Sequence, residues 1–167
     1  MFDSSFVTLI LKNSLRSPMF WIPTENFANI DFALYRDADR PPYCSFLTFD
    51  TVEGLRIMAN TSQIQAAVLS TRPGHGKLTG SPPPTSIDFQ LAGRDQIQTE
   101  NSIPSDQVAE LFNGLGSKYE ILPFPCLTSD SGRVIMVNPN ELAYIVARQS
   151  LLAQGQRIID AREAGKA

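Results

Sequence analysis

Histidine and cysteine are scarce in this sequence. The 167 residues include one histidine, His75, and two cysteines, Cys44 and Cys126. Catalysis by a Ser–His–Asp or Cys–His system needs a histidine that packed neighbours hold within hydrogen-bond reach. His75 instead lies in the glycine-rich stretch 73–76, where we expect a solvated loop. A zinc site needs three or four suitably spaced ligands. The sequence therefore predicts neither a histidine-based active site nor a metal or cofactor site.

Long apolar runs and clusters of basic residues are also missing. No stretch is long enough to span a membrane, and residues 6–11 lack the basic flank and cleavage site of a signal peptide. The net charge is −3 and the 14 lysines and arginines are scattered, so the chain as a whole repels nucleic acid phosphates. We expect a cytoplasmic protein in which Cys44 and Cys126 stay reduced, since they would pair only in an oxidising compartment.

The composition is that of a globular chain. Hydrophobic residues make up 43% and charged residues 19% of the sequence, which separates it from disordered proteins. The length suits a single domain, residues 1–167, that buries a core without a metal or a disulfide. Residues 19–22 are apolar at every position, which is typical of a strand covered on both faces.

Two segments share the same interval from a glycine to an asparagine. Gly54 precedes Asn60 by six residues, Gly132 precedes Asn138 by six, and an aliphatic residue follows each asparagine four positions later. Glycine permits the positive φ of a tight turn, and asparagine ends the returning strand in an Asx turn. The pattern predicts a repeated β-meander, with a looser copy at the N-terminus. The repeats are expected at about residues 6–35, 44–70 (continuing through 85–116) and 119–147.

Two helices and one long insertion complete the predicted elements. Apolar residues at helical spacing after Ser105 predict a helix over about 105–115, and a stripe at seven-residue spacing predicts a C-terminal helix over about 147–164. Residues 71–85 form a loop rich in glycine and proline, and so long an insertion is either functional or mobile. The expected fold class is mainly β with two helices, in which the meanders assemble into a barrel-like or sandwich-like body.

Part of this pattern resembles a known family, the short flagellar-operon proteins of the FlbD family. The shared features are a hairpin with a glycine turn, an asparagine at the strand end, an aliphatic residue four positions on, a second glycine hairpin and a helix. In this chain they are Gly54, Asn60, Ile64, Gly93 and residues 105–115. The resemblance covers about residues 51–115 and is interrupted by the insertion at 71–85. It implies a small barrel-like unit with a regulatory or assembly role, and it identifies no functional residue.

Three functional hypotheses follow from these patterns. The first is a non-enzymatic structural or interaction protein that forms a homo-oligomer, because open strand edges and a striped helix need cover. The second is a nucleic-acid-binding small barrel, Sm-like in style, in which Arg16, Arg56 and Arg133 gather on one rim because each lies near a turn of its repeat. The third is an enzyme with an unfamiliar site near residues 71–85.

Overall fold

The computed structural model describes residues 4–28, 30, 46–74, 76–116 and 126–166. Its strands are β1 Ser4–Leu11, β2 Pro18–Pro23, β3 Phe46–Asp50, β4 Leu55–Asn60, β5 Ile64–Ser70, β6 Lys77–Leu78, β7 Ile87–Leu91, β8 Ile97–Glu100, β9 Cys126–Thr128, β10 Val134–Met136 and β11 Leu142–Arg148. Its helices include α2 Ser105–Gly116, α3 Gln149–Ala164 and the 3-10 turns Thr61–Gln63 and Pro139–Glu141. None of the helices in this part of the chain is long and apolar enough to cross a lipid bilayer.

The strands form two larger sheets and one small hairpin. The four-stranded sheet has the order β5-β1-β2-β6, the five-stranded sheet has the order β3-β4-β11-β7-β8, and β9 pairs with β10. Neighbouring strands are antiparallel, except that β2 and β6 run parallel. Over the described residues each sheet ends in two edge strands and none closes into a ring. The expected mainly-β class is confirmed, and its form is stacked open sheets rather than a barrel.

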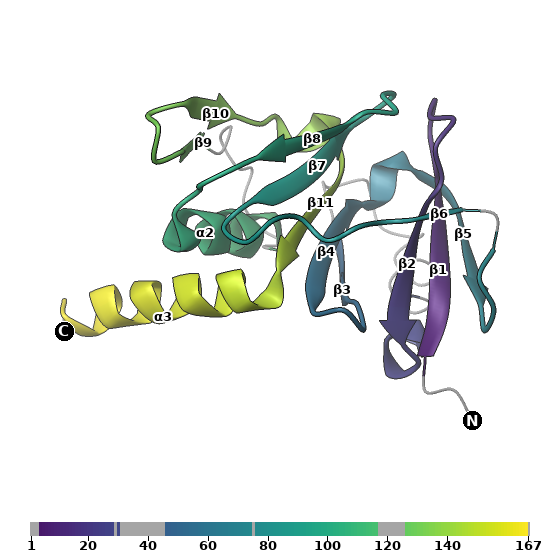
Figure 1. Cartoon of the computed structure of the whole chain (residues 1–167), viewed down its shortest axis with the longest axis horizontal. Helices are drawn as coiled ribbons and strands as arrows, with labels where there is room; N and C mark the ends of the chain where they lie inside the picture. Colours follow the sequence, from purple (N-terminus) through teal and green to yellow (C-terminus); the bar gives the residue numbers. More distant parts are fainter. Residues whose placement is uncertain (1–3, 29, 31–45, 75, 117–125, 167) are drawn as a thin grey trace.

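The five-stranded sheet is the middle of three layers (Figure 1). Successive side chains of a strand point to opposite faces, so Ile57 and Met58 of β4 belong to different cores. Ile57 shares a core with Phe20 and Ile22 of the four-stranded sheet, whereas Met58 shares a core with Phe112 of α2. One core therefore lies between the two sheets, and a second lies between the five-stranded sheet and the helices.

Both predicted helices form. α2 spans Ser105–Gly116 and turns its apolar side chains toward the second core. α3 begins at Gln149 rather than at about residue 147, because Ala147 and Arg148 still belong to β11 and pair with β4.

The two helices contact each other closely at Gly155. A Cβ atom at this position would overlap the main-chain oxygen of Ser105 and would lie 2.9 Å from the Cβ atom of Ala109. Leu151 and Leu152 of the predicted stripe are buried near this contact, whereas Ile158 further along α3 is 41% exposed. The stripe is therefore fully buried only in the first part of the helix.

The expected hairpins form, but the strand after each asparagine turn differs from that of a meander. β1 pairs with β2, β3 with β4, and β9 with β10. β5 then pairs with β1 instead of β4, and β11 pairs with β4 and β7 instead of β10. The 3-10 turns redirect the chain, so each third strand enters a different sheet from the hairpin before it. Parts of the expected repeats, residues 31–45 and 117–125, lie outside the described residues.

The insertion at residues 71–85 packs against the four-stranded sheet. It contains β6, which adds to β2, and it passes in front of β1 and β2 in Figure 1. A Cβ atom on Gly76 would lie 2.8 Å from Cγ2 of Thr8 and 2.9 Å from the main-chain oxygen of Ser17, so only glycine fits here without movement. Further along, the oxygen of Pro82 accepts a hydrogen bond from Nε of Arg148 at 2.9 Å. These contacts hold the insertion along its length.

Candidate interaction surface

The two glycine turns singled out in the sequence have the same local geometry. Gly54 and Gly132 both have positive φ, +83° and +81°. In the first turn the amide of Thr51 donates to the oxygen of Leu55 at 2.9 Å, and in the second the amide of Ser129 donates to the oxygen of Arg133 at 2.9 Å. The hydroxyl oxygens of Thr51 and Ser129 also accept from the same two opposite residues, Leu55 at 3.1 Å and Arg133 at 3.2 Å.

The two asparagine turns match in the same way. Oδ1 of Asn60 accepts from the amide of Ser62 at 3.0 Å, and Oδ1 of Asn138 accepts from the amide of Asn140 at 3.1 Å. Each asparagine thereby caps a 3-10 turn. The turn chemistry predicted for Gly54, Asn60, Gly132 and Asn138 is therefore present at all four positions.

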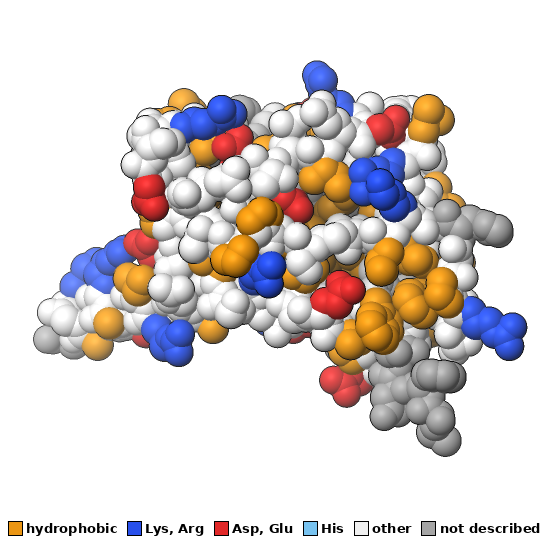
Figure 2. Space-filling view, in the orientation of Figure 1, with side chains coloured by type: hydrophobic (Ala, Val, Ile, Leu, Met, Phe, Trp, Pro, Cys, Tyr) orange, Lys and Arg blue, Asp and Glu red, His pale blue; other side chains and the backbone are white. Residues whose placement is uncertain are grey.

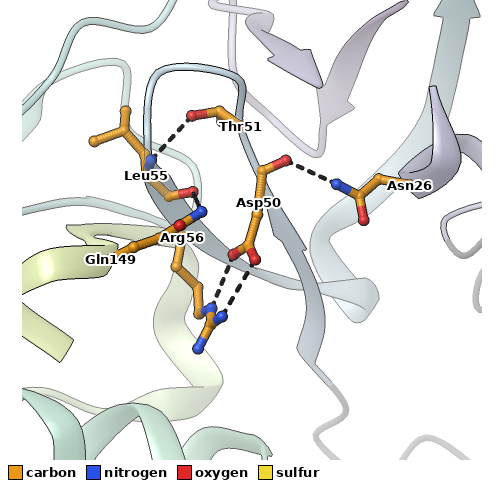
Figure 3. Close-up of polar contacts among 6 residues, drawn as sticks. All are labelled: Asn26, Asp50, Thr51, Leu55, Arg56 and Gln149. Atoms are coloured by element: carbon orange, nitrogen blue, oxygen red, sulfur yellow. Dashed lines mark hydrogen bonds and ion pairs between the residues drawn. The ribbon is translucent and has the colours of Figure 1, made fainter. Parts of the chain in front are cut away.

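Arg56 is engaged with a neighbouring carboxylate (Figure 3). Its Nε lies 2.8 Å from Oδ1 of Asp50, and its Nη2 lies 3.2 Å from Oδ2. This is the bidentate geometry of a strong ion pair. The hydrogen bond to Asp50 raises the pKa of Arg56 above its ordinary value. The main-chain oxygen of Asp50 in turn accepts from Asn26 at 3.2 Å. Arg56 therefore fastens β4 to β3.

Arg133 and Arg16 also lie beside carboxylates, on other parts of the molecule. Arg133 contacts Oε1 of Glu100 at 3.0 Å. The amide of Arg16 donates to Oδ1 of Asp95 at 3.1 Å, and the same oxygen accepts from the Ser14 hydroxyl at 2.7 Å, which lowers the pKa of Asp95.

The structure does not bring the three arginines of the predicted rim together. The arginines belong to elements that lie well apart in Figure 1, namely the β1–β2 turn, the start of β4 and the β9–β10 turn. Within the described residues, no two of them share a hydrogen-bond or ion-pair partner.

A shallow polar hollow of about 280 Å³ lies between β8 and the β9–β10 turn. Its lining residues are Gln98, Thr99, Glu100, Asn101, Ser129, Ser131 and Arg133. The hydroxyls of Ser129 and Ser131 bond to each other at 2.8 Å, and Arg133 pairs with Glu100. Residues 71–85 do not line it, so this hollow is separate from the enzyme site proposed from the sequence.

Of the two cysteines and the single histidine, the structure describes Cys126 alone. Cys126 is exposed and has a free thiol. Cys44 and His75 lie outside the described residues. Over the part of the chain that is described, no group of three histidine, cysteine or acidic residues is placed to hold a metal ion.

A buried polar group under the β1–β2 turn was missed by sequence reasoning. Gln90 and Tyr144 are register neighbours on β7 and β11, and both are fully buried. Nε2 of Gln90 donates to Oγ of Ser14 at 3.2 Å and to the oxygen of Arg94 at 2.6 Å. Burial raises the pKa of Tyr144 to about 12. The available signal is the polar residue at every second position of residues 86–91, but the same alternation is typical of a half-buried strand with one side toward solvent.

Apolar side chains gather on the outer face of the four-stranded sheet (Figure 2). Phe6 of β1 stacks on Trp21 of β2, with ring centroids 6.2 Å apart and planes within 9°. Ile10, Val68 and Leu78 lie on the same face and are 37%, 49% and 44% exposed. We refer to Phe6, Ile10, Trp21, Val68 and Leu78 as the outer apolar face. The expectation that residues 19–22 are covered on both sides holds for Met19, which is buried, but Trp21 is only partly buried.

Comparison with known proteins gives no relative. No family model, no curated protein sequence and no solved structure matches this chain. The resemblance to the FlbD family thus stays an expectation from the sequence, and any function must be argued from the geometry above.

Proposed function

We propose that this chain is a non-enzymatic interaction protein that associates with itself. The observation that carries the proposal is the outer apolar face, where a stacked aromatic pair and three exposed aliphatic side chains lie on one sheet. Single exposed apolar residues are normal, but several apolar side chains gathered on one face of a sheet are typical of an interaction site. The aliphatic members come from three different strands, so the face exists only in the folded sheet.

The strength of the association follows from the size of this face. Burying a Val, Leu or Ile side chain contributes roughly 1.5–3 kcal/mol, and association of two bodies costs at least about 4 kcal/mol. Counted on both partners, three half-exposed aliphatic residues and an aromatic pair therefore support a reversible association, with a dissociation constant of micromolar order at the tightest, rather than a permanent complex.

The arrangement of charged groups also supports an interaction protein over the two alternatives. Arg56 and Arg133 already contact Asp50 and Glu100, so binding a nucleic acid phosphate through them would break existing ion pairs. In the polar hollow, the serine hydroxyls bond to each other. A nucleophile would instead need a base within hydrogen-bond reach.

A repeated building unit is part of this proposal. The glycine and asparagine turns of the two segments share their φ angles, their hydrogen-bond donors and their acceptors. This agreement supports one hairpin–turn–strand unit that occurs twice in the chain, with its third strand placed in different sheets.

Light scattering after size-exclusion chromatography tests the proposal. From about 1 to 200 µM the mass should rise above the 18.4 kDa of a single chain. Ile10→Lys should weaken the association, because position 10 belongs to the outer apolar face and is 37% exposed. Ile158→Lys is the matched control, since Ile158 is 41% exposed on α3. A single-chain mass at every concentration would contradict self-association, and retention on immobilised DNA or RNA at low salt would favour the nucleic-acid alternative.

A further inference from the structure

The edge strands of the two larger sheets are not alike. In the described part of the chain these edges are β5, β6, β3 and β8. Three of them contain a charged residue, Lys77 in β6, Asp50 in β3 and Glu100 in β8, and have two to five residues. β5 has seven residues, of which residues 66–70 pair with β1 in regular register after an irregularity at Gln65, and it contains no charge, no proline and no glycine. Natural proteins usually protect exposed edges with such residues, because an unprotected edge pairs readily with another strand.

The core between the sheets is incompletely covered at β5. Leu69 and Ala67 of β5 point toward this core and pack against it, but they are only partly buried. Their register partners on β1, Val7 and Leu9, have no exposed surface. The inward side chains are therefore fully buried on β1 but only partly buried on its neighbour β5. One more strand beside β5 would cover the inward side chains.

On the outward face of the sheet, exposure likewise rises from β1 to β5. Val68 is 49% exposed, whereas its register partner Thr8 on β1 is 9% exposed and lies under the insertion. An added strand would therefore bury apolar surface on both faces of the sheet and supply partners for the outward main-chain groups of β5.

We infer that β5 of one chain pairs antiparallel with β5 of a second copy about a two-fold axis, joining the two four-stranded sheets into one. This rests on the proposed self-association and names its contact. A two-fold interface is self-complementary, which suits a strand with no charge to repel its own copy. Pairing centred on Ala67 sets Val68 of each chain opposite the small Ala66 of the other, so neither side chain blocks the approach.

The size of the contact sets the conditions of the test. A stable dimer usually buries about 800 Å² per partner, and one pair of seven-residue strands with part of the outer apolar face gives less. We therefore expect a reversible dimer in the micromolar range, measured by sedimentation equilibrium over about 5 to 200 µM.

Two matched substitutions separate this contact from docking through the whole outer face. Val68 and Leu78 are aliphatic residues of similar exposure, 49% and 44%, on opposite edges of the same sheet. Val68→Lys puts like charges close together across the two-fold axis, so the dissociation constant should rise at least about tenfold. Leu78→Lys should change it less than about twofold. Both side chains are exposed enough for the variants to fold, and thermal unfolding checks this.

Hydrogen exchange of the unmodified chain gives a second measurement. Amides of residues 64–70 should exchange more slowly at 200 µM than at 5 µM, a range of about fortyfold. An equal effect of the two substitutions, or unchanged exchange in β5 of a chain that does dimerise, would overturn β5 pairing and leave self-association standing. A wild-type chain that stays single throughout would overturn both.

Discussion

Asn60 joins the two asparagine turns of the protein, because its Nδ2 atom donates a hydrogen bond to the main-chain oxygen of Leu142 at 2.9 Å. Its Oδ1 atom meanwhile accepts from the amide of Ser62 at 3.0 Å, and the residue has no exposed surface. One side chain thus caps the turn between β4 and β5 and holds the start of β11 beside it. Asn138 makes the equivalent cap on Asn140, but it is only half-buried.

This difference predicts unequal costs for two equivalent substitutions. Asn60→Ala removes the cap and also leaves the buried oxygen of Leu142 without this donor, so it should lower the free energy of unfolding by about 2–4 kcal/mol. Asn138→Ala removes a more exposed cap and should cost about 1 kcal/mol. Urea unfolding of both variants measures the difference. Equal costs would show that the bond to Leu142 contributes nothing measurable.

The local turns were predictable from the sequence because their causes are local. A positive φ at Gly54 and Gly132 and a cap from an asparagine need only a few neighbouring residues. The destination of the strand after each turn was not predictable in this way. β5 pairs with β1, more than fifty residues earlier, and short-range patterns do not specify such a partner.

For the candidate sites, too, local features were predictable from the sequence and tertiary partners were not. Arg56 and Arg133 follow their glycines by two residues and by one, and their acidic partners come from different elements, Asp50 on β3 and Glu100 on β8. Residues 19–22 indicated two apolar faces, yet how much of the outward face stays uncovered depends on where the insertion packs, and it packs against Thr8 and Met19 of that face. The outer apolar face is therefore a property of the tertiary structure and not of any one segment.

Gly155 predicts a large effect for a small substitution. Gly155→Ala would put a methyl group into the main chain of Ser105, which no side-chain rotation relieves, so α3 must shift. Alanine favours a helix by about 1 kcal/mol, but the overlap should outweigh this and lower stability by about 1–3 kcal/mol, or several degrees in Tm. Gly165→Ala is the control, because its Cβ atom would make only ordinary contacts at 3.5 Å. A Gly155→Ala variant as stable as the wild type would mean that α2 and α3 have room for a methyl group between them.

The burial of Tyr144 predicts that the free energy of unfolding falls at alkaline pH. Burial raises its pKa to about 12 in the folded protein, whereas a tyrosine in an unfolded chain titrates near about 10. The folded state holds the Tyr144 proton more tightly than the unfolded state does. The protonated hydroxyl therefore makes its full contribution to the free energy of unfolding below about pH 10, and this contribution is lost as pH rises through about 12. The loss amounts to roughly 3 kcal/mol, at about 1.4 kcal/mol for each pH unit between the two values.

Tyr144→Phe isolates this effect from the other tyrosines. The variant keeps the buried ring, which packs edge-on against Phe20 with centroids 5.7 Å apart, and removes only the titrating hydroxyl. At neutral pH its stability should lie within about 1 kcal/mol of the wild type, and between about pH 10 and 12 it should lose less stability than the wild type. Absorbance at alkaline pH should show that one tyrosine of the four in the wild type ionises late and is missing from the variant. Identical pH profiles for the two proteins would mean that the Tyr144 hydroxyl reaches solvent and ionises normally.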